Sequence, residues 1–346
     1  MFKLKRHFGG PILSPNKNLE WEREGVFNPG VIQTDKGIIM LYRAVGEREA
    51  YISRFGLAKS LDGVNFERLS KEPVFGPGEF FDHWSTEDPR IIKIDNEYFI
   101  TYVAVPERIM NNGRSILRPI PLETSAALLK TKNFVSFEKM GLISPAGSDN
   151  KDIVIFPQKI GGRYAMLHRP NRWSKEWFST SYEKFVDEGL PCPIEKLPDQ
   201  PSIWLAWSDN LKNWTDHKLL IWPEHHLDEK VGPGLPPIKT IDGWLLVYHH
   251  VARDWNTGSF VYSTRVALVD LNNPSKLLSK IPYDILAPEA SYETEGEVKV
   301  VFPTGGFVKD DILFVYYGSS DRYVCLATGL LSELLAELQK HKIKMQ

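Results

Sequence analysis

Five segments of the chain share one pattern of apolar and polar positions. Each begins at or near a proline, continues as an apolar strand, turns on small polar residues and returns as an apolar strand that ends in aromatic or basic residues. The turns contain glycine, asparagine and aspartate, which tolerate the positive φ of tight hairpins. The pattern therefore predicts five β-hairpins: "NPGVIQTDKGIIMLYRAV" from Asn28, "DPRIIKIDNEYFITYVAV" from Asp88, "FPQKIGGRYAMLHRP" from Phe156, "PPIKTIDGWLLVYHHV" from Pro236 and "FPTGGFVKDDILFVYYGS" from Phe302.

A third strand follows each hairpin, and in three copies it ends in a common phrase. In "LAKSLDGVNF", "LLKTKNFVSF" and "LAWSDNLKNW" a hydroxyl residue precedes an aromatic residue by the same offset, namely Ser60 and Phe66, Thr131 and Phe137, and Ser208 and Trp214. The polar turn between them predicts a fourth strand. Four short antiparallel strands that recur every ~60 to 80 residues are typical of a β-propeller blade.

The sequence thus predicts an all-β fold, a five-bladed β-propeller that forms one domain over residues 1–346, with residues 1–26 as an N-terminal strap. A β-sandwich is the alternative, but the recurring offsets favour the propeller. Helical periodicity is convincing only in residues 331–344, which carry an apolar stripe of Leu331, Leu334, Leu335 and Leu338.

Composition narrows the function classes. The chain has 346 residues, of which 42% are hydrophobic and 25% charged, and its net charge of −2 provides no bulk attraction to nucleic acid or anionic membrane. We find no apolar run of a secretory signal or of a membrane span. Cys192 and Cys325 lie outside any CxxC spacing, so we expect two free thiols and a cytoplasmic protein.

Two insertions are too long for hairpin loops and too aromatic or apolar for linkers, residues 105–122 and 170–201. We expect them to rim a cleft. Tryptophans could stack on sugar rings there or pack between blades. The candidates are Trp173, Trp177, Trp204, Trp207 and Trp255, and those in the second insertion favour the ligand interpretation because no blade needs them.

The starts of the inner strands should converge at one end of the propeller axis, because the first strand of each blade lines the central channel. Asn28, Asp88, Lys151, Lys230 and Phe302 are therefore predicted neighbours. In "STEDPRI", Glu87 and Asp88 should face a shared pocket, or at least one of them should, because adjacent residues on a strand point to opposite faces. One carboxylate is thus expected in the site and the other in a structural role.

Basic residues are the commonest polar type in or beside these inner-strand positions: Arg43, Arg54, Arg90, Lys151, His168, Arg169, Lys230 and His249. Burying an unpaired charge costs several kcal/mol, so some of them should pair with Glu87, Asp321 or Glu47. So many cations beside so few carboxylates suggest an anionic ligand.

Other chemistries find no support in the sequence. There is no GxxxxGK[ST], GxSxG, HExxH or GxGxxG phrase. The His-His pairs at 225–226 and 249–250 do not favour a metal site, because adjacent strand residues point in opposite directions. No cofactor or metal is expected.

In the order and spacing of its phrases, the sequence resembles glycoside hydrolase family 130, the inverting β-mannoside phosphorylases and related β-mannosidases. The phrases extend over nearly the whole chain: "FNPGV", "LYRAVGE", "SRFGLAKSLDG", "EDPRI", "KDIVIFPQKIGGRYAMLHRP", "KVGPGLPPI", "GWLLVYHHV", "VVFPTGG" and "YYGSSD". The resemblance implies a five-bladed propeller, in agreement with the repeat.

The resemblance also implies residue roles. Asp88 looks like the family's proton donor, which is thought to act through the 3-hydroxyl of the mannosyl residue. Phosphate ligands are implied at Lys151, Arg169, Lys230, Tyr248, His249 and Asp321, with Lys151 where some β-1,4 members have arginine. Asn28, Arg43 and Arg54 match positions that hold the sugar, and we assign Glu87, Arg90 and His168 to the substrate site as well.

The expected reaction follows from the number of carboxylates. An inverting hydrolase needs a second carboxylate to activate water, whereas a phosphorylase needs only the acid because phosphate is the nucleophile. We expect phosphate to attack a β-mannosidic bond of a manno-oligosaccharide from the opposite face, Asp88 to supply the proton and α-mannose 1-phosphate to be released. The alternatives are a β-mannosidase that uses Glu293, Glu297 or Asp321 and a non-catalytic sugar-binding propeller.

The sequence leaves the linkage (β-1,4 or β-1,2), the acceptor sugar, the chain length and the oligomeric state open. A homo-oligomer would be compatible with the family resemblance. Two departures from the family pattern bear on the linkage and the acceptor: His250 stands where many relatives have glycine, and "EGEVKVVFP" lacks the Pro-Asn that often precedes the Val-Phe-Pro phrase.

Overall fold

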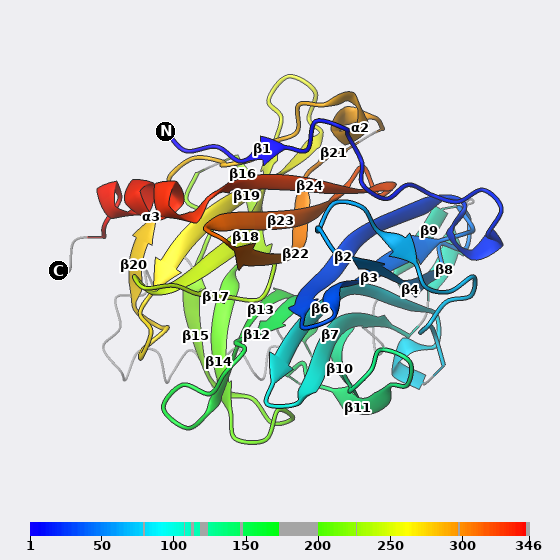
Figure 1. The fold of residues 1–346 in the computed structure, drawn as a ribbon, viewed down its shortest axis with the longest axis horizontal. Coiled ribbons are helices and arrows are strands. Elements are labelled where there is room, and N and C mark those ends of the chain that lie inside the picture. Colours follow the sequence, from blue (N-terminus) through cyan, green and yellow to red (C-terminus); the bar gives the residue numbers. More distant parts are fainter. Residues whose placement is uncertain are drawn as a thin grey trace.

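The protein is a five-bladed β-propeller with a short C-terminal helix, which confirms the predicted fold class (Figure 1). At most junctions between blades, the inner strands contact one another around the axis. The computed structural model describes residues 1–78, 80–106, 108–111, 114–117, 124–145, 148–172, 200–225, 227–296 and 298–343.

The strands of each blade pair in order from the axis outward. Blade 1 contains β2 (Gly25–Thr34), β3 (Gly37–Val45), β4 (Ser53–Ser60) and β5 (Glu67–Arg68). Blade 2 contains β6 (Ser85–Ile94), β7 (Glu97–Val105), β10 (Ser125–Thr131) and β11 (Glu138–Leu142), with the separate hairpin of β8 (Arg108–Asn111) and β9 (Arg114–Leu117) between β7 and β10. Blade 3 contains β12 (Asp149–Ile155), β13 (Tyr164–Arg172), β14 (Ile203–Ser208) and β15 (Thr215–Ile221).

The last two blades include short additions. Blade 4 contains β16 (Asp228–Pro233), β18 (Trp244–Arg253), β19 (Phe260–Val269) and β20 (Leu277–Lys280), with β17 (Ile238–Lys239) beside β18 and β21 (Lys299–Val300) beside β19. Blade 5 contains β22 (Phe302–Lys309), β23 (Ile312–Ser319), β24 (Tyr323–Leu330) and β1 (Lys5–Arg6). The helices are η1 (Glu20–Glu22), η2 (Phe80–Asp82), α2 (Ser291–Thr294) and α3 (Leu331–Lys340).

For blades 3 and 4, the predicted hairpin begins after the inner strand instead of with it. The inner strands of blades 3 and 4 are β12 and β16, which lie before Phe156 and Pro236 rather than after them. Proline cannot donate a backbone hydrogen bond to a ladder, so the prolines after β12 and β16 interrupt the sheet instead of opening it. The other three inner strands contain the predicted proline phrase.

The hydroxyl phrase marks the same turn in three blades. The Ser60 hydroxyl accepts hydrogen bonds from the backbone N–H of Asp62 and Gly63 at 3.2 and 2.9 Å. Thr131 accepts them in the same way from Asn133 and Phe134 at 3.3 and 3.0 Å. Such local side-chain acceptors stabilise turns, which explains why this phrase recurs where the third strand of a blade ends.

Both ends of the chain complete the last blades. β1 pairs with β24 at the outer edge of blade 5, and Phe2 and Leu4 are buried in the same core as Leu334 and Leu338 of α3. The helix ends at Lys340, before the predicted residue 344, which lies outside the described residues. After it the chain follows the edge of β20, where the N–H of Ile343 donates to the Leu278 carbonyl at 2.9 Å.

The predicted tryptophans have different surroundings. Trp204 is buried and Trp207 packs half-buried between blades 3 and 4, whereas Trp255 is 79% exposed. Trp173 and Trp177 lie outside the described residues, as does Cys192, while Cys325 is a buried free thiol. None of the described helices is long and apolar enough to cross a membrane.

Closure of blade 5 by the N-terminal segment is testable with two apolar residues of that segment. Leu4→Ala should lower the free energy of unfolding by about 2 to 4 kcal/mol, because it leaves a cavity where β1 meets the core. Phe8→Ala is the matched control, since Phe8 is 99% exposed and its loss should change stability by less than about 0.5 kcal/mol. Urea unfolding measures both, and equal midpoints would contradict a closing role.

Candidate active site

The inner strands of all five blades carry a register shift near their starts. The shifts lie between Phe27 and Gly30, Glu87 and Arg90, Lys151 and Val154, Asp228 and Lys230, and Pro303 and Gly305. Asn28, Asp88 and Asp152 occupy three of them with positive φ of 45°, 52° and 58°. A bulge bends the strand and re-aims its side chains. The predicted convergence therefore depends on bulges as well as on the propeller itself.

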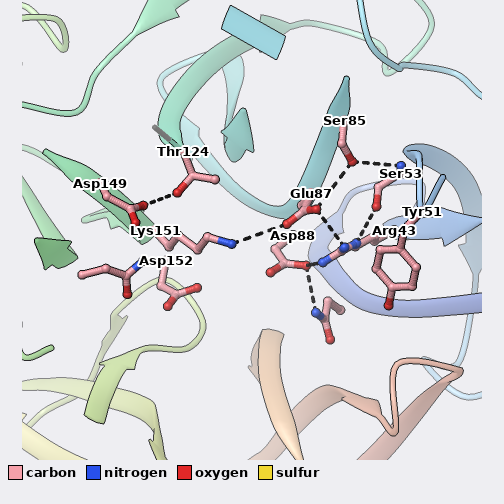
Figure 2. A network of polar contacts seen from close by, with 12 residues as sticks. Arg43, Tyr51, Ser53, Ser85, Glu87, Asp88, Thr124, Asp149, Lys151 and Asp152 are labelled. Carbon is pink, nitrogen blue, oxygen red and sulfur yellow. Dashed lines mark hydrogen bonds and ion pairs between the residues drawn. The ribbon is translucent and has the colours of Figure 1, made fainter. Parts of the chain in front are cut away.

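Glu87 and Asp88 both contact the same arginine. Arg43 lies 2.9 Å from the Glu87 carboxylate through Nη2 and 3.0 Å from Asp88 Oδ1 through Nη1 (Figure 2). Alternation along a regular strand would have separated the two carboxylates. The left-handed backbone at Asp88 and the bulge behind it turn both toward Arg43 instead, contrary to the sequence-based expectation.

One oxygen of Asp88 is held by two donors. Asn28 Nδ2 donates to Oδ1 at 2.8 Å, beside the Arg43 contact, and the residue is only 7% exposed. Arg90 Nη1 also fixes the Asp88 backbone carbonyl at 2.9 Å. These contacts set the orientation of the carboxyl group, and both side-chain donors seen among the described residues lie at Oδ1.

Arg43 is itself fixed. Its Nε donates to the Ser53 hydroxyl at 2.8 Å, and its guanidinium lies over the rings of Phe27 and Tyr51. Burial alone would lower the pKa of Arg43, but the Glu87 and Asp88 carboxylates outweigh burial and raise that pKa above its usual value. Arg43 is therefore a permanent cation between two acids.

Asp152 organises a second group of cations. Its Oδ2 accepts from Arg169 Nε and Nη2 at 2.8 and 2.6 Å, and its Oδ1 accepts from Arg90 Nη2 at 3.1 Å. His249 Nε2 lies 3.7 Å from Oδ2. Burial alone would raise the pKa of Asp152, but Arg169 and its other basic neighbours lower that pKa below its usual range. Asp152 is not among the site residues predicted from the sequence.

Lys151 and Lys230 are the lysines of the site. Lys151 approaches Glu87 from the side opposite Arg43, at 3.8 Å (Figure 2). Within the described part of the chain, Lys230 has no ion pair, and its ammonium lies 5.1 Å from the centre of the Tyr262 ring. Burial and then repulsion from Arg169 lower the pKa of Lys230 to about 8, although Asp152 opposes this shift. The Lys230 ammonium is thus without a counterion among the described residues.

His249 is buried between these groups. Its ring packs against Phe302, and neither ring nitrogen has a hydrogen-bond partner among the described residues. Burial lowers the pKa of His249 well below its usual value, so the ring is neutral at pH 7 and offers one donor and one acceptor. Tyr262, also absent from the sequence prediction, lies beside His249 and Lys230, and burial raises its pKa to about 12.

Four predicted site residues have other contacts. Arg54 pairs with Glu47 at 3.2 Å, one of the pairings expected from sequence. All three guanidinium nitrogens of Arg90 donate to buried protein oxygens. Tyr248 packs in the core between blades 3 and 4, because it points away from its neighbour His249. His168 is buried 3.0 Å from both Asn150 and His217, and burial lowers its pKa well below its usual value.

Asp321 lies on the Arg43 side of the site. Its carboxylate accepts a hydrogen bond of 3.3 Å from the Tyr51 hydroxyl. The Asp321 side chain is exposed, yet many protein atoms surround its carboxylate. The resulting desolvation, together with repulsion from Asp88 and Glu87, raises the pKa of Asp321 despite the nearby Arg43. The structure thus brings Asp321 close to the acidic pair rather than into the Asp152 group.

Two glycines allow side chains of the site to approach the backbone. A Cβ at Gly318 would lie 1.8 Å from Asn28 Oδ1, and a Cβ at Gly232 would lie 2.4 Å from the His249 ring. Any other residue at these positions would displace a site residue. The glycines of "YYGSSD" and "KVGPG" therefore have direct steric roles.

An oriented acid beside a group of cations, at one end of a five-bladed propeller, defines a carbohydrate-active enzyme that uses an anion in glycosidic bond chemistry. A family model described as β-1,4-mannooligosaccharide phosphorylase matches residues 11–340, and the chain belongs to this family, glycoside hydrolase family 130. The family predicted from the sequence phrases is confirmed.

The chain is similar to known relatives over nearly its full length. The chain is 39% identical to a 1,2-β-oligomannan phosphorylase of Thermoanaerobacter sp. (strain X514), with 94% of this chain and 97% of that protein covered. It is 36% identical to a β-1,2-mannobiose phosphorylase of the same organism over 99% and 100%. The structure of a β-1,2-mannobiose phosphorylase from Listeria innocua in complex with β-1,2-mannobiose superposes with a TM-score of 0.77, at 26% identity over 98% and 99%.

The close contact at Gly318 yields a test of the Asp88 geometry. Gly318→Ala should displace Asn28 from Asp88 and reduce turnover of a mannobiose by about tenfold or more, because a small misplacement of a catalytic group is costly. Gly78→Ala is the matched control, since its nearest new contact is the end of Lys139 at 3.4 Å. Steady-state assays compare the two, and equal turnover would show that Asn28 does not orient the acid.

Proposed function

We propose that the protein phosphorolyses β-1,2-linked manno-oligosaccharides with inversion and releases α-mannose 1-phosphate. The observation that carries the proposal is the pairing of one oriented acid, Asp88, with basic groups that have hydrogen-bonding capacity to spare among the described residues. Lys230 and His249 are the clearest of these groups, and Arg169 and Lys151 lie on the same side. A tetrahedral anion would supply the missing acceptors.

In the proposed step a phosphate oxygen forms a bond to the anomeric carbon while the bond from that carbon to the glycosidic oxygen breaks. Asp88 supplies the proton that the leaving oxygen takes up, from Oδ2, because Oδ1 already accepts from Asn28 and Arg43. The cations offset the repulsion between phosphate and the acidic pair and hold the nucleophile in line. The mannosyl group moves to phosphate, so the enzyme is a hexosyl-transferring glycosyltransferase by reaction type, and the reverse synthesis should occur.

The linkage is inferred from the relatives. Both Thermoanaerobacter proteins and the Listeria innocua protein are described as acting on β-1,2-linked mannosides. In addition, Lys151 stands where some β-1,4 members have arginine, which would replace a bidentate phosphate contact with a point charge. Both observations favour β-1,2-linked substrates.

Hydrolysis has less support because, of the three carboxylates considered for water activation, only Asp321 remains a candidate among the described residues. Glu293 is fully buried, where it accepts from Arg6 and from the Tyr317 hydroxyl. Glu297 lies outside the described residues, and Asp321 is the remaining predicted candidate. The cation group would also have no function in hydrolysis.

We further infer a cytoplasmic location, since Cys325 is a thiol and a reducing compartment would keep it so.

The role of Asp88 is tested by substitution. Asp88→Asn keeps the two contacts at Oδ1 but removes the transferable proton, so phosphorolysis of β-1,2-mannobiose should fall by about 10² to 10⁴-fold. Asp95→Asn, in the hairpin turn of the same blade, is the control and should retain activity. Mannose 1-phosphate and free mannose are measured separately, with and without inorganic phosphate. Equal release of mannose without phosphate would establish hydrolysis instead.

Anion binding should depend on the charge of Lys230. Its pKa of about 8 means that the ammonium is present below pH 8 and is lost as the pH rises through that value. Sulfate, a competitor of phosphate that does not titrate in this range, should therefore inhibit progressively less above pH 8. Lys230→Arg stays charged and should remove this break from the profile. An unchanged break in Lys230→Arg would assign the titration to another group.

A further inference from the structure

Asp152 occupies in blade 3 the position that Asp88 occupies in blade 2. Each residue lies in the bulge of its inner strand with positive φ, 58° for Asp152 and 52° for Asp88, and Asn28 does the same in blade 1. The propeller therefore brings two carboxylates of equivalent backbone geometry to adjacent blades. Their surroundings differ, and this difference assigns them different roles.

The oxygens of Asp88 and Asp152 are used differently. Among the described residues, the Asp88 carboxyl group has side-chain contacts at Oδ1 only, whereas both oxygens of Asp152 accept hydrogen bonds from arginines. Asp152 is 1% exposed, and Arg169 approaches it side-on through Nε and Nη2. A carboxylate held in this way cannot activate water or donate a proton. It can fix the plane of the Arg169 guanidinium.

We propose that Asp152 is a positioning residue for the phosphate site, which orients Arg169 and balances the charge of the surrounding cations. The inference rests on the proposed phosphorolysis and extends it to a residue that touches no substrate. Arg169 has one nitrogen, Nη1, outside the Asp152 contact, and this nitrogen donates a hydrogen bond to Asn171 Oδ1. The side-on pair thus restricts Arg169 to one orientation, in which Nη1 faces away from Asp152.

Asp152 also balances the charge of its basic neighbours. Without Asp152, the arginines at 90 and 169 would lose their shared buried anion, and two buried cations would repel each other. The pKa of Lys230 would fall further, because Asp152 is the carboxylate that most strongly opposes the loss of the Lys230 proton. The charged or titratable groups that act on Lys230 come from five strands: Lys151, Asp152, Arg169, Glu229, His249 and Tyr262.

Two variants separate orientation from charge. Asp152→Asn removes the charge and one acceptor, so the KM for inorganic phosphate should rise by about tenfold or more while the KM for β-1,2-mannobiose stays within about threefold. The pH break of sulfate inhibition should also move below pH 8, because Lys230 loses its stabilising anion. Asp152→Glu keeps the charge but moves it, so the KM for phosphate should rise while the pH break stays near that of the unmodified enzyme.

A buried carboxylate elsewhere provides the matched control. Asp82 is fully buried and accepts from Lys139 at 3.0 Å and from the Tyr102 hydroxyl at 2.7 Å. Asp82→Asn should lower stability but leave the KM for phosphate and the pH break unchanged. If Asp152→Asn does not fold, Asp152→Glu alone decides. An unchanged KM for phosphate in the folded variant, or equal increases in both KM values, would overturn the positioning role.

Phosphate binding without turnover separates this inference from the proposed function. Inorganic phosphate should raise the Tm of the unmodified protein and raise it less in both Asp152 variants. If the enzyme releases mannose without phosphate, the proposed function fails, yet this shift still tests Asp152. If the shift is the same in all three proteins, the positioning role is wrong even when phosphorolysis is observed.

Discussion

The site depends on the bulges near the starts of the inner strands. A regular strand would direct successive side chains to opposite faces, and only half of the polar residues at these positions would reach the axis. Left-handed backbone at Asn28, Asp88 and Asp152 breaks this alternation in three neighbouring blades. Asparagine and aspartate adopt this conformation more readily than other non-glycine residues. One residue can therefore both form the bulge and supply a polar side chain to the site.

The charges of the site form two groups in which anions and cations alternate. Arg43 lies between Glu87 and Asp88, and Asp152 lies between Arg90 and Arg169. Lys151 links the groups, since it neighbours Asp152 in sequence and approaches Glu87. Each ion of these two groups has a counterion, whereas Lys230 has none among the described residues, and this contrast is the basis for proposing that an anion binds there.

Much of this arrangement could be predicted from sequence because the repeat fixes the blades and the blades fix where the inner strands begin. Asp88, Lys151, Arg169, Lys230 and His249 were found in this way. Asp152 was missed because the third repeat was aligned on the proline after Phe156, although the bulge of that blade lies in β12, before Phe156. The phrase "KDIV" lacks the proline of "NPG" and "DPR", so no local signal marked it.

Tyr262 and Tyr248 illustrate a different limit. Which face of a strand a tyrosine occupies depends on register, and the phrase "VYHH" does not show which of its members points to the axis. His249 packs against Phe302 in the site, so its neighbour Tyr248 must enter the core between blades, and the tyrosine beside Lys230 comes from the next strand, β19. Residue type was sufficient to predict a group of basic residues near Asp88, whereas the assignment of each contact required the bulges and the pairing of β18 with β19.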